Sequence, residues 1–267
     1  QGVFMKWSEG FDAEQSALWH SLIEQRLGMV LPSRQQGLFE QCIKSSWQQS
    51  GLSLEQYLAL LVRDAEAWQQ LAERLLIHET QFFRHPPSFA VVAQHCRERQ
   101  QLLRVWSAGC ATGEETWSLA ITAAEQGCPV QVFGTDYSDA ALSEARAGCY
   151  AVRRVSRLSE AQRERFGSYD AARRHWRVGQ SLRAQVVFGR QNLHSLSDYA
   201  LRDMDIVFCQ NVLIYFRRFE RRDIVQKMIE HLRPGGLLVL GPGELSGWQP
   251  VGVRRHPDLQ TLAYLKL

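Results

Sequence analysis

From Arg104 onward, short apolar runs alternate with amphipathic segments, and this alternation limits the possible folds more than any other feature. The runs have the length of strands, and the segments between them carry apolar residues at helical spacing. Strands that alternate with helices form a mostly parallel sheet covered on both faces. The predicted strands are residues 104–108, 130–136, 185–191, 204–211, 237–244 and 262–267, and the predicted helices are 114–127, 138–148 and 219–236. The fold class is therefore expected to be α/β.

The rest of the chain differs from this pattern. Residues 8 to about 75 read as helices throughout, with Ser53 as a candidate N-cap. Residues 149–185 are rich in arginine and interrupt the alternation, as an inserted surface subdomain would. We therefore expect a helical domain at 1–76, a connecting segment at 77–90, and a sheet domain at 91–267 with an insert at about 149–185. Residues 1–4 are expected to precede a native start at Met5.

Composition excludes several classes of function. The net charge of +3 is too small to indicate a nucleic-acid partner, and no apolar run approaches the roughly 20 residues of a membrane span. The N-terminal stretch lacks the features of a signal peptide. The six cysteines form no C-x-x-C pair, and His78-Glu79 does not continue into a zinc-protease motif because position 82 is Phe. We expect a cytoplasmic protein with reduced thiols and no metal.

The turn after the first predicted strand, SAGCATGEE at 107–115, is the candidate binding site. Gly109 and Gly113 allow the backbone to approach a ligand closely. The turn matches neither the dinucleotide-binding fingerprint nor the phosphate-binding loop. The carboxylates of Glu114 and Glu115 would repel a phosphate, so the ligand is expected to be cationic or zwitterionic. S-adenosylmethionine carries both a sulfonium and an amino group.

Asp136 ends the second predicted strand, at about the distance from the turn where a ribose-binding acid is expected. A carboxylate can accept two hydrogen bonds from a ribose diol. The alternative is that Asp136 only caps the helix that follows it.

Three stretches together carry a resemblance to a known family: HETQFFRHPPSF at 78–89, VWSAGCATGEETWSLAI at 105–121 and FCQNVLIYF at 208–216. In order and spacing they resemble the chemotaxis-receptor methyltransferases, the CheR family. The resemblance implies a Rossmann-like class I methyltransferase sheet, an all-α N-terminal domain and a small inserted β-subdomain. It also implies S-adenosylmethionine as methyl donor, with S-adenosylhomocysteine as product, and glutamate side chains of a bacterial chemoreceptor as acceptors.

Site residues follow from the same resemblance, position by position. The residues matched to the cofactor are His78, Thr80, Arg84, Gly109, Glu115, Asp136, Asn192, Leu193, Asn211 and Val212. Arg84, which also steers the acceptor, and Tyr215, which faces the methyl group, are the expected catalytic residues. The structural alternatives are a solvated charge for Arg84, a strand-end hydrogen bond for Asn211 and a core position for Tyr215. Phe82, Phe83 and Trp106 are expected to pack rather than to bind.

Three departures from the family pattern support a rival interpretation. His78 replaces the usual Asn, Gln210 replaces a common Arg, and GPGE at 241–244, with Pro242, replaces G-H-S-E. The chain could therefore be a signalling protein that binds the cofactor without turnover. The arginine-rich insert motivates a second rival, a methyltransferase for nucleic acid or a small molecule.

The expected partner is the acidic cytoplasmic helix of a chemoreceptor, docked on a monomer through the N-terminal helices and the insert. The basic candidates for this contact are Arg26, Arg34, Lys44, Arg153, Arg154, Arg157, Arg173, Arg174 and Arg177. Any one of them could instead lie on a solvated helix face. The insert looks short around residues 167–176, so we expect recognition without a receptor-tail peptide.

Overall fold

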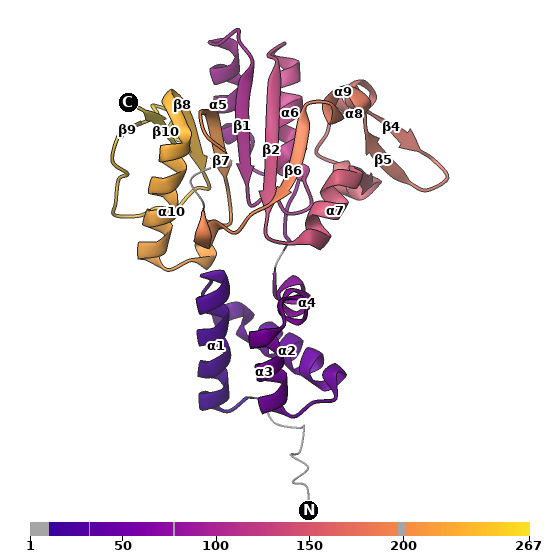
Figure 1. The fold of residues 1–267 in the computed structure, drawn as a ribbon. Helices are drawn as coiled ribbons and strands as arrows, with labels where there is room; N and C mark the ends of the chain where they lie inside the picture. The colour runs from indigo at the N-terminus through magenta and orange to yellow at the C-terminus, as the bar shows by residue number, and fades with distance from the viewer. Residues whose placement is uncertain (1–10, 32, 77, 197–200) are drawn as a thin grey trace, which may run out of the picture. The chain divides into compact units, whose positions relative to one another are not determined.

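The computed structural model describes residues 11–31, 33–76, 78–196 and 201–267 (Figure 1). The chain forms two compact units, one of Gln1–Ile77 with Tyr215–Arg217 and one of His78–Ile214 with Arg218–Leu267. Residues 1–5, where an added segment and a native start are expected, lie outside the described residues.

A seven-stranded sheet forms the core of the larger unit, in the order β6-β2-β1-β7-β8-β10-β9 (Figure 1). The strands are β1 (Leu103–Ala108), β2 (Val130–Asp136), β6 (Val186–Arg190), β7 (Met204–Cys209), β8 (Leu232–Leu240), β9 (Val253–Arg255) and β10 (Leu262–Lys266). Neighbours from β6 to β8 pair in parallel, whereas β10 pairs antiparallel with both β8 and β9. The prediction of a mostly parallel α/β sheet is therefore confirmed.

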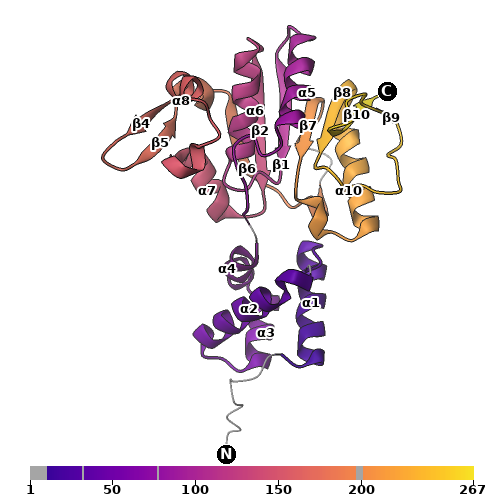
Figure 2. The ribbon, with the colours of Figure 1, turned by 180° about the vertical axis from the view of Figure 1, so that it is seen from behind.

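Helices cover both faces of this sheet. They are α5 (Pro86–Arg97), α6 (Glu114–Glu125), α7 (Asp139–Ala147) and α10 (Arg218–His231). Figure 2 shows α5 and α6 in front of β1 and β2, whereas α10 lies on the opposite face. Ser138 caps α7 by accepting a hydrogen bond from the Ala141 amide, and Gly148 ends the helix at φ +53°, both as the sequence predicts.

Several boundaries differ from the prediction, two of them for a clear reason. The helix expected at 219–236 ends at His231, because Leu232 already pairs with Met204 as the first residue of β8. Helix α5 begins inside the segment read as a connection. Pro86 and Pro87 open it, and prolines are tolerated in a first helical turn although they resemble a loop signal in sequence.

The insert holds a second, three-stranded antiparallel sheet in the order β3-β5-β4. Its elements are β3 (Cys149–Ala151), η2 (Val152–Val155), α8 (Glu160–Phe166), β4 (Gly167–Asp170), β5 (His175–Val178) and α9 (Gln180–Arg183). The fully buried Phe82 meets Tyr150 and Trp176 edge-on, with ring centroids 5.2 and 6.0 Å apart. Phe82 therefore packs, as expected, and joins the segment before the sheet to the insert.

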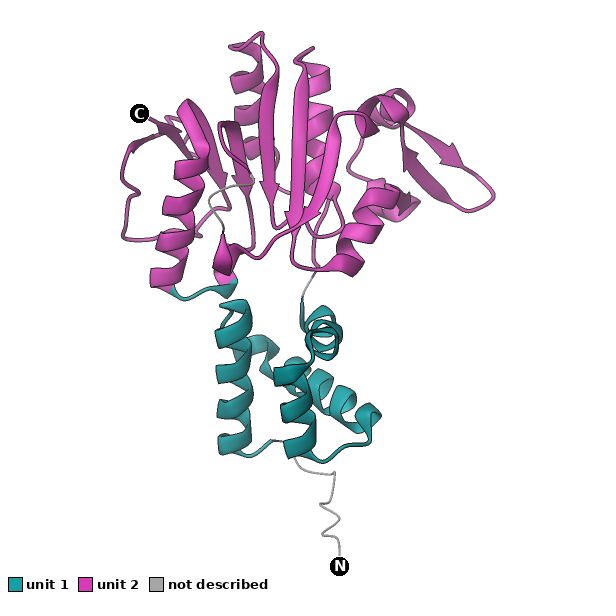
Figure 3. Cartoon of the chain, in the orientation of Figure 1, with its two compact units in different colours: residues 1–77, 215–217 teal, residues 78–214, 218–267 magenta. Residues whose placement is uncertain are grey.

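The smaller unit is helical (Figure 3). It contains α1 (Ala13–Leu27), η1 (Ser33–Gln35), α2 (Gln36–Ser50), α3 (Leu54–Arg63) and α4 (Ala65–Leu75), and Ser53 caps α3 as predicted. Its core side chains include Trp19, Ile23, Ile43, Leu61, Trp68 and Leu71, all at most 4% exposed. Tyr215–Arg217 join this unit because Met29 bridges to Phe216 and the Val30 amide donates to the Tyr215 carbonyl over 2.7 Å.

Other features bear on the class of protein. None of the helices in the described ranges combines the length and apolar character of a membrane span. All six cysteines fall in those ranges and are free thiols. Among the described residues, no group of three or more His, Cys, Asp or Glu side chains is arranged to hold a metal ion.

Candidate active site

Three predicted site segments meet at one edge of the large sheet. Strands β2, β1 and β7 are parallel neighbours, so their carboxyl ends lie side by side. Gly109 follows β1, Asp136 ends β2, and Asn211 lies two residues after β7. Ligands of doubly wound sheets bind at this edge.

The turn after β1 is held by β2. The amides of Gly109 and Cys110 both donate to the Thr135 carbonyl, at 2.8 and 2.9 Å. The Ala111 amide donates to Asp136 Oδ2 over 2.8 Å, and Ala111 itself has a positive φ of 47°. The Asp136 carboxylate thus fixes the shape of the turn on which the ligand is expected.

Asp136 is not the cap of the helix that follows. Ser138 caps α7, and its amide donates to Asp136 Oδ1 over 3.0 Å. Each carboxylate oxygen therefore accepts one backbone amide and keeps a further lone pair. This geometry fits the predicted contact with a ribose diol.

The acidic pair at the start of α6 divides between two environments. Glu114 is 1% exposed, accepts the Thr112 hydroxyl at 2.7 Å and forms an ion pair with Arg154 of the insert. Glu115 turns the other way and accepts the Ser107 hydroxyl of β1 at 2.7 Å. Only Glu115 remains available to a ligand at the sheet edge, which agrees with its predicted contact at the methionine end of the cofactor.

The ionised form of the Glu115 carboxyl is disfavoured by its surroundings. Burial raises the pKa of its carboxyl well above the usual range, and the nearby carboxylates of Glu244 and Asp136 add to this rise. The Ser107 hydroxyl and the Arg84 guanidinium act in the opposite direction. A cation placed beside Glu115 would relieve this cost, so the site favours a positively charged ligand group.

The segment before α5 carries three predicted contacts. Arg84 donates to the Glu79 carbonyl over 2.6 Å, and its guanidinium stands 4.0 Å from the Glu79 carboxylate. His78 and Thr80 line a pocket of about 330 Å³ with Thr112, Ala140, Ala141, Glu144 and Arg154. His78 Nε2 is buried without a hydrogen-bond partner, so His78, although it replaces Asn, has a polar atom that nothing in the described residues satisfies.

The turn after β7 lies against the turn after β1. Asn211 has a positive φ of 60°, and Val212 packs onto Gly109 so closely that a Cβ on Gly109 would overlap the Val212 side chain. Gly109 is thus required by close approach as well as by its own φ of +72°.

The remaining predicted residues are placed differently. Asn192 follows β6, and its side chain accepts the His194 amide at 3.0 Å, beside the buried Leu193. The preceding residue, Gln191, donates its amide to the Asp136 carbonyl over 2.9 Å, so this pair lies next to the end of β2. Tyr215 belongs to the helical unit, while every other predicted site residue belongs to the sheet unit.

Two supporting residues were not predicted. Glu244 accepts the amides of Val212 and Leu213, each at 3.0 Å, and Ser107 holds Glu115 as described above. Both stand in motifs that the sequence singles out, GPGE and W-S-A, but polar residues in a turn or strand carry no local sign of such distant partners.

Gln210, which stands where the family commonly has arginine, is buried and hydrogen-bonded. It is 6% exposed, and its amide nitrogen donates to Ser88 Oγ over 2.7 Å and to the Leu240 carbonyl over 3.2 Å. This departure from the family pattern therefore ties α5 to β8. Trp106 is fully buried and donates to Thr135 Oγ1 over 2.9 Å, as expected for a core residue.

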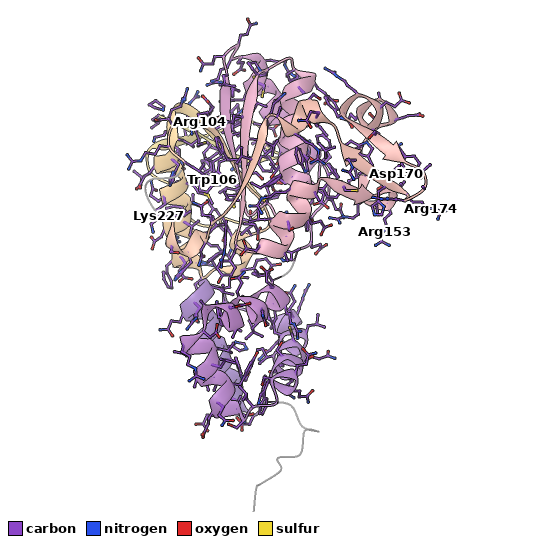
Figure 4. All side chains as sticks on the ribbon, turned by 45° about the vertical axis from the view of Figure 1, so that its right-hand side comes forward. Arg104, Trp106, Arg153, Asp170, Arg174 and Lys227 are labelled. Carbon is purple, nitrogen blue, oxygen red and sulfur yellow. The ribbon has the colours of Figure 1, made fainter. Side chains whose placement is uncertain are left out.

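The structure corrects the basic docking set. Arg154 joins Glu114 and Glu144 by ion pairs and donates to Thr112 Oγ1 over 2.8 Å, so it serves the interior of the sheet unit. Arg26 stacks 5.1 Å over Trp68 and donates to the Val62 carbonyl, within the helical unit. Lys44 is half-buried, and the other six candidates are exposed: Arg34, Arg153, Arg157, Arg173, Arg174 and Arg177. Figure 4 labels Arg153 and Arg174 on the insert.

The described residues fit S-adenosylmethionine. A carboxylate that favours a cation, a second carboxylate with free lone pairs and a glycine turn meet at one sheet edge. Residues 78–249 match the family model described as "CheR methyltransferase, SAM binding domain". The chain is thus an S-adenosylmethionine-dependent methyltransferase.

Relatives cover most of the chain. A "Chemotaxis protein methyltransferase" of Salmonella typhimurium is 33% identical over 84% of this chain and 81% of its own length. "Chemotaxis protein methyltransferase 1" of Pseudomonas aeruginosa is 31% identical over 85% of this chain and 88% of its own length. The "Probable biofilm formation methyltransferase WspC" of Pseudomonas putida is 32% identical over 91% of this chain but only 60% of its own length.

Proposed function

This chain belongs to the CheR methyltransferase family, and from that premise we propose that it methylates glutamate side chains of a bacterial chemoreceptor. The product would be a glutamate methyl ester, formed for adaptation in chemosensory signalling. The observation that carries the proposal is the likeness to chemotaxis methyltransferases over more than four fifths of both chains. A receptor's cytoplasmic part is the substrate, so the enzyme would act in the cytoplasm.

We assign the cofactor contacts by position. Glu115 would bind the amino group of the methionine part, Arg84 its carboxylate and Asp136 the ribose hydroxyls. His78 and Thr80 would be further cofactor contacts, Asn192 and Leu193 would flank the adenine, and Asn211 and Val212 would contact the cofactor from the turn after β7. When bound, S-adenosylmethionine supplies a methyl group activated by its sulfonium.

The acceptor needs no general base, because a glutamate carboxylate is already ionised at neutral pH, with a reference pKa near 4.3. The protein's task is to align this carboxylate and to exclude water from it. We assign the alignment to Arg84 and Tyr215. Arg84 is partly buried and already near Glu79, which would limit how tightly it holds the acceptor oxygen.

Receptor docking is assigned to exposed basic residues. Arg34 on the helical unit and Arg153, Arg174 and Arg177 on the insert would face an acidic receptor helix. We propose that no receptor-tail peptide is needed, so receptors truncated at the C-terminus should be methylated at an unchanged rate. A rate that falls tenfold on truncation would show instead that the tail is bound.

The test is transfer of radiolabelled methyl groups from S-adenosylmethionine to membranes that hold the host's chemoreceptors. We expect alkali-labile label on the receptors with the wild type, and a loss of at least about tenfold with Arg84→Ala. Arg97→Ala is the matched control, because Arg97 lies exposed at the end of α5, away from the site, where its side chain donates to Gln126 Oε1 over 2.9 Å. It should leave transfer unchanged.

Two outcomes would overturn the proposal. Cofactor binding without label on any receptor would indicate a signalling protein without turnover. Label on nucleic acid, with strongly salt-dependent binding, would indicate the other rival.

A further inference from the structure

Glu244 brings a buried carboxylate to the turn after β7. Its Oε1 accepts the amides of Val212 and Leu213, each at 3.0 Å, and its Oε2 accepts the Gly241 amide at 2.7 Å. The residue is 2% exposed, and no ion pair within the described residues neutralises it. Because the buried carboxylate accepts these backbone amides, it fixes their positions relative to one another.

The turn that it holds needs such support. Asn211 adopts a φ of +60°, in the left-handed region that asparagine tolerates better than most residues but that its surroundings still have to stabilise. The next two amides are those that Glu244 accepts. Leu213 is fully buried beyond them, so the carboxylate and the core together define the turn.

The same turn sets one wall of the cofactor site. Val212 lies directly against Gly109, and a Cβ on Gly109 would stand 3.1 Å from Val212 Cγ1. A shift of the Val212 backbone would therefore change the space between the turns after β7 and β1.

We propose that Glu244 is a positioning residue for cofactor binding: its carboxylate holds Asn211 and Val212 in the form that fits S-adenosylmethionine. The inference rests on the proposed site, in which Asn211 and Val212 contact the cofactor. Burial raises the pKa of the Glu244 carboxyl, and hydrogen bonds from nearby backbone amides counter part of this rise. Both carboxyl oxygens accept backbone N–H groups, an arrangement that favours the ionised form.

A glutamine cannot replace it. Glu244→Gln keeps the shape but turns one acceptor into an NH₂ group that faces a backbone N–H. We expect the Kd for S-adenosylmethionine, measured by calorimetry, to rise about tenfold, which corresponds to the loss of one charge-assisted hydrogen bond. The kcat at saturating cofactor should change less than about threefold, because Glu244 is not placed at the acceptor.

Asp205 is the matched control. It is also a 2% exposed carboxylate that accepts a backbone amide, that of Arg104 at 2.8 Å. It differs from Glu244 in its ion pair with Arg233 at 3.3 Å and in its place at the opposite end of β7. Asp205→Asn should lower the thermal stability and leave the Kd for the cofactor within about twofold of wild type. An equal Kd for the two folded variants would overturn the inference.

Gly241→Ala covers the case in which Glu244→Gln does not fold. Gly241 does not have a positive φ, and its added Cβ would stand 2.5 Å from Glu244 Oε2 and 3.2 Å from the Asn211 amide. We expect the same rise in Kd, and an unchanged Kd would overturn the inference. Calorimetric binding is independent of the receptor, so a failure to methylate receptors would count against the proposed function alone.

Discussion

Gly109 and Val212 touch across the edge of the sheet, with no room for a side chain between them. A Cβ at position 109 would overlap Val212 Cγ2 and stand 3.1 Å from Cγ1. The contact joins the turn after β1 to the turn after β7, and these turns carry predicted cofactor contacts from two separate motifs.

Replacement of Gly109 by alanine should therefore weaken the cofactor site. We expect Gly109→Ala to cost about 1 kcal/mol for its positive φ and roughly 1–3 kcal/mol more for the crowding of Val212, with a matching loss of cofactor affinity. Chemical denaturation and calorimetry measure the two effects. Gly127→Ala is the control, since Gly127 has a similar φ of +65° but nothing within 4 Å of its added Cβ. Equal losses of stability in the two variants would show that crowding at Gly109 is unimportant.

Asp136→Asn should reduce the affinity for S-adenosylmethionine by about tenfold or more. The amide group would present an NH₂ to the Ala111 or Ser138 amide and lose an acceptor for the ribose. Calorimetric titration measures the change. Asp139→Asn is the control, because Asp139 lies three residues later with an exposed side chain, and it should leave the affinity within about twofold of that of the wild type. The prediction fails if both variants bind alike.

Glu115→Gln should stabilise the free protein and weaken cofactor binding. The folded-state pKa of Glu115 lies above its unfolded value, so the unfolded chain loses its proton first as the pH rises. Stability is therefore lost from about pH 4.3 upward, through the window that ends at the raised folded-state pKa. Glutamine removes this cost at neutral pH.

Thermal melts of the free wild type and Glu115→Gln, from about pH 4 to 8, test this sign. The variant should melt higher at pH 8, and the difference should shrink towards pH 4. Calorimetry at neutral pH should show an affinity for S-adenosylmethionine lowered by about tenfold, because the ammonium loses its carboxylate. A variant that melts lower at every pH would contradict the argument.

Arg154→Ala should destabilise the sheet unit by about 2 kcal/mol. The substitution removes the ion-pair partner of Glu114, whose side chain is only 1% exposed. Because 31% of the Arg154 side chain is exposed, solvent screens part of this ion pair. The melting temperature should fall by roughly 4–8 °C. Arg153→Ala, at the exposed neighbouring position, should change it by less than about 1 °C. If instead Arg153→Ala alone reduces receptor methylation, the two arginines have the separate roles assigned here.

Local patterns in the sequence were sufficient for six of the seven strands of the large sheet, for the glycine turn and for the caps of α3 and α7, whereas β9 was missed. Alternation and helical spacing depend on neighbours along the chain, and Ser53 and Ser138 cap helices through amides three residues away. The position of Asp136 at a strand end indicated a ribose contact, and motif order identified the family, which extended the prediction to Asn211.

Tertiary structure decided the roles of residues that resemble each other in sequence. Glu114 and Glu115 are adjacent, yet successive helical residues point in different directions, and only the folded chain brings Arg154 to one and Ser107 to the other. Arg154 looked like a docking residue for the same reason: its two carboxylate partners lie 40 and 10 positions away. Glu244 meets Val212 from 32 positions further along the chain. The sequence by itself determined the elements and the turn because these depend on neighbouring residues, whereas long-range pairing of charges and amides exists only once the sheet has brought strand ends together.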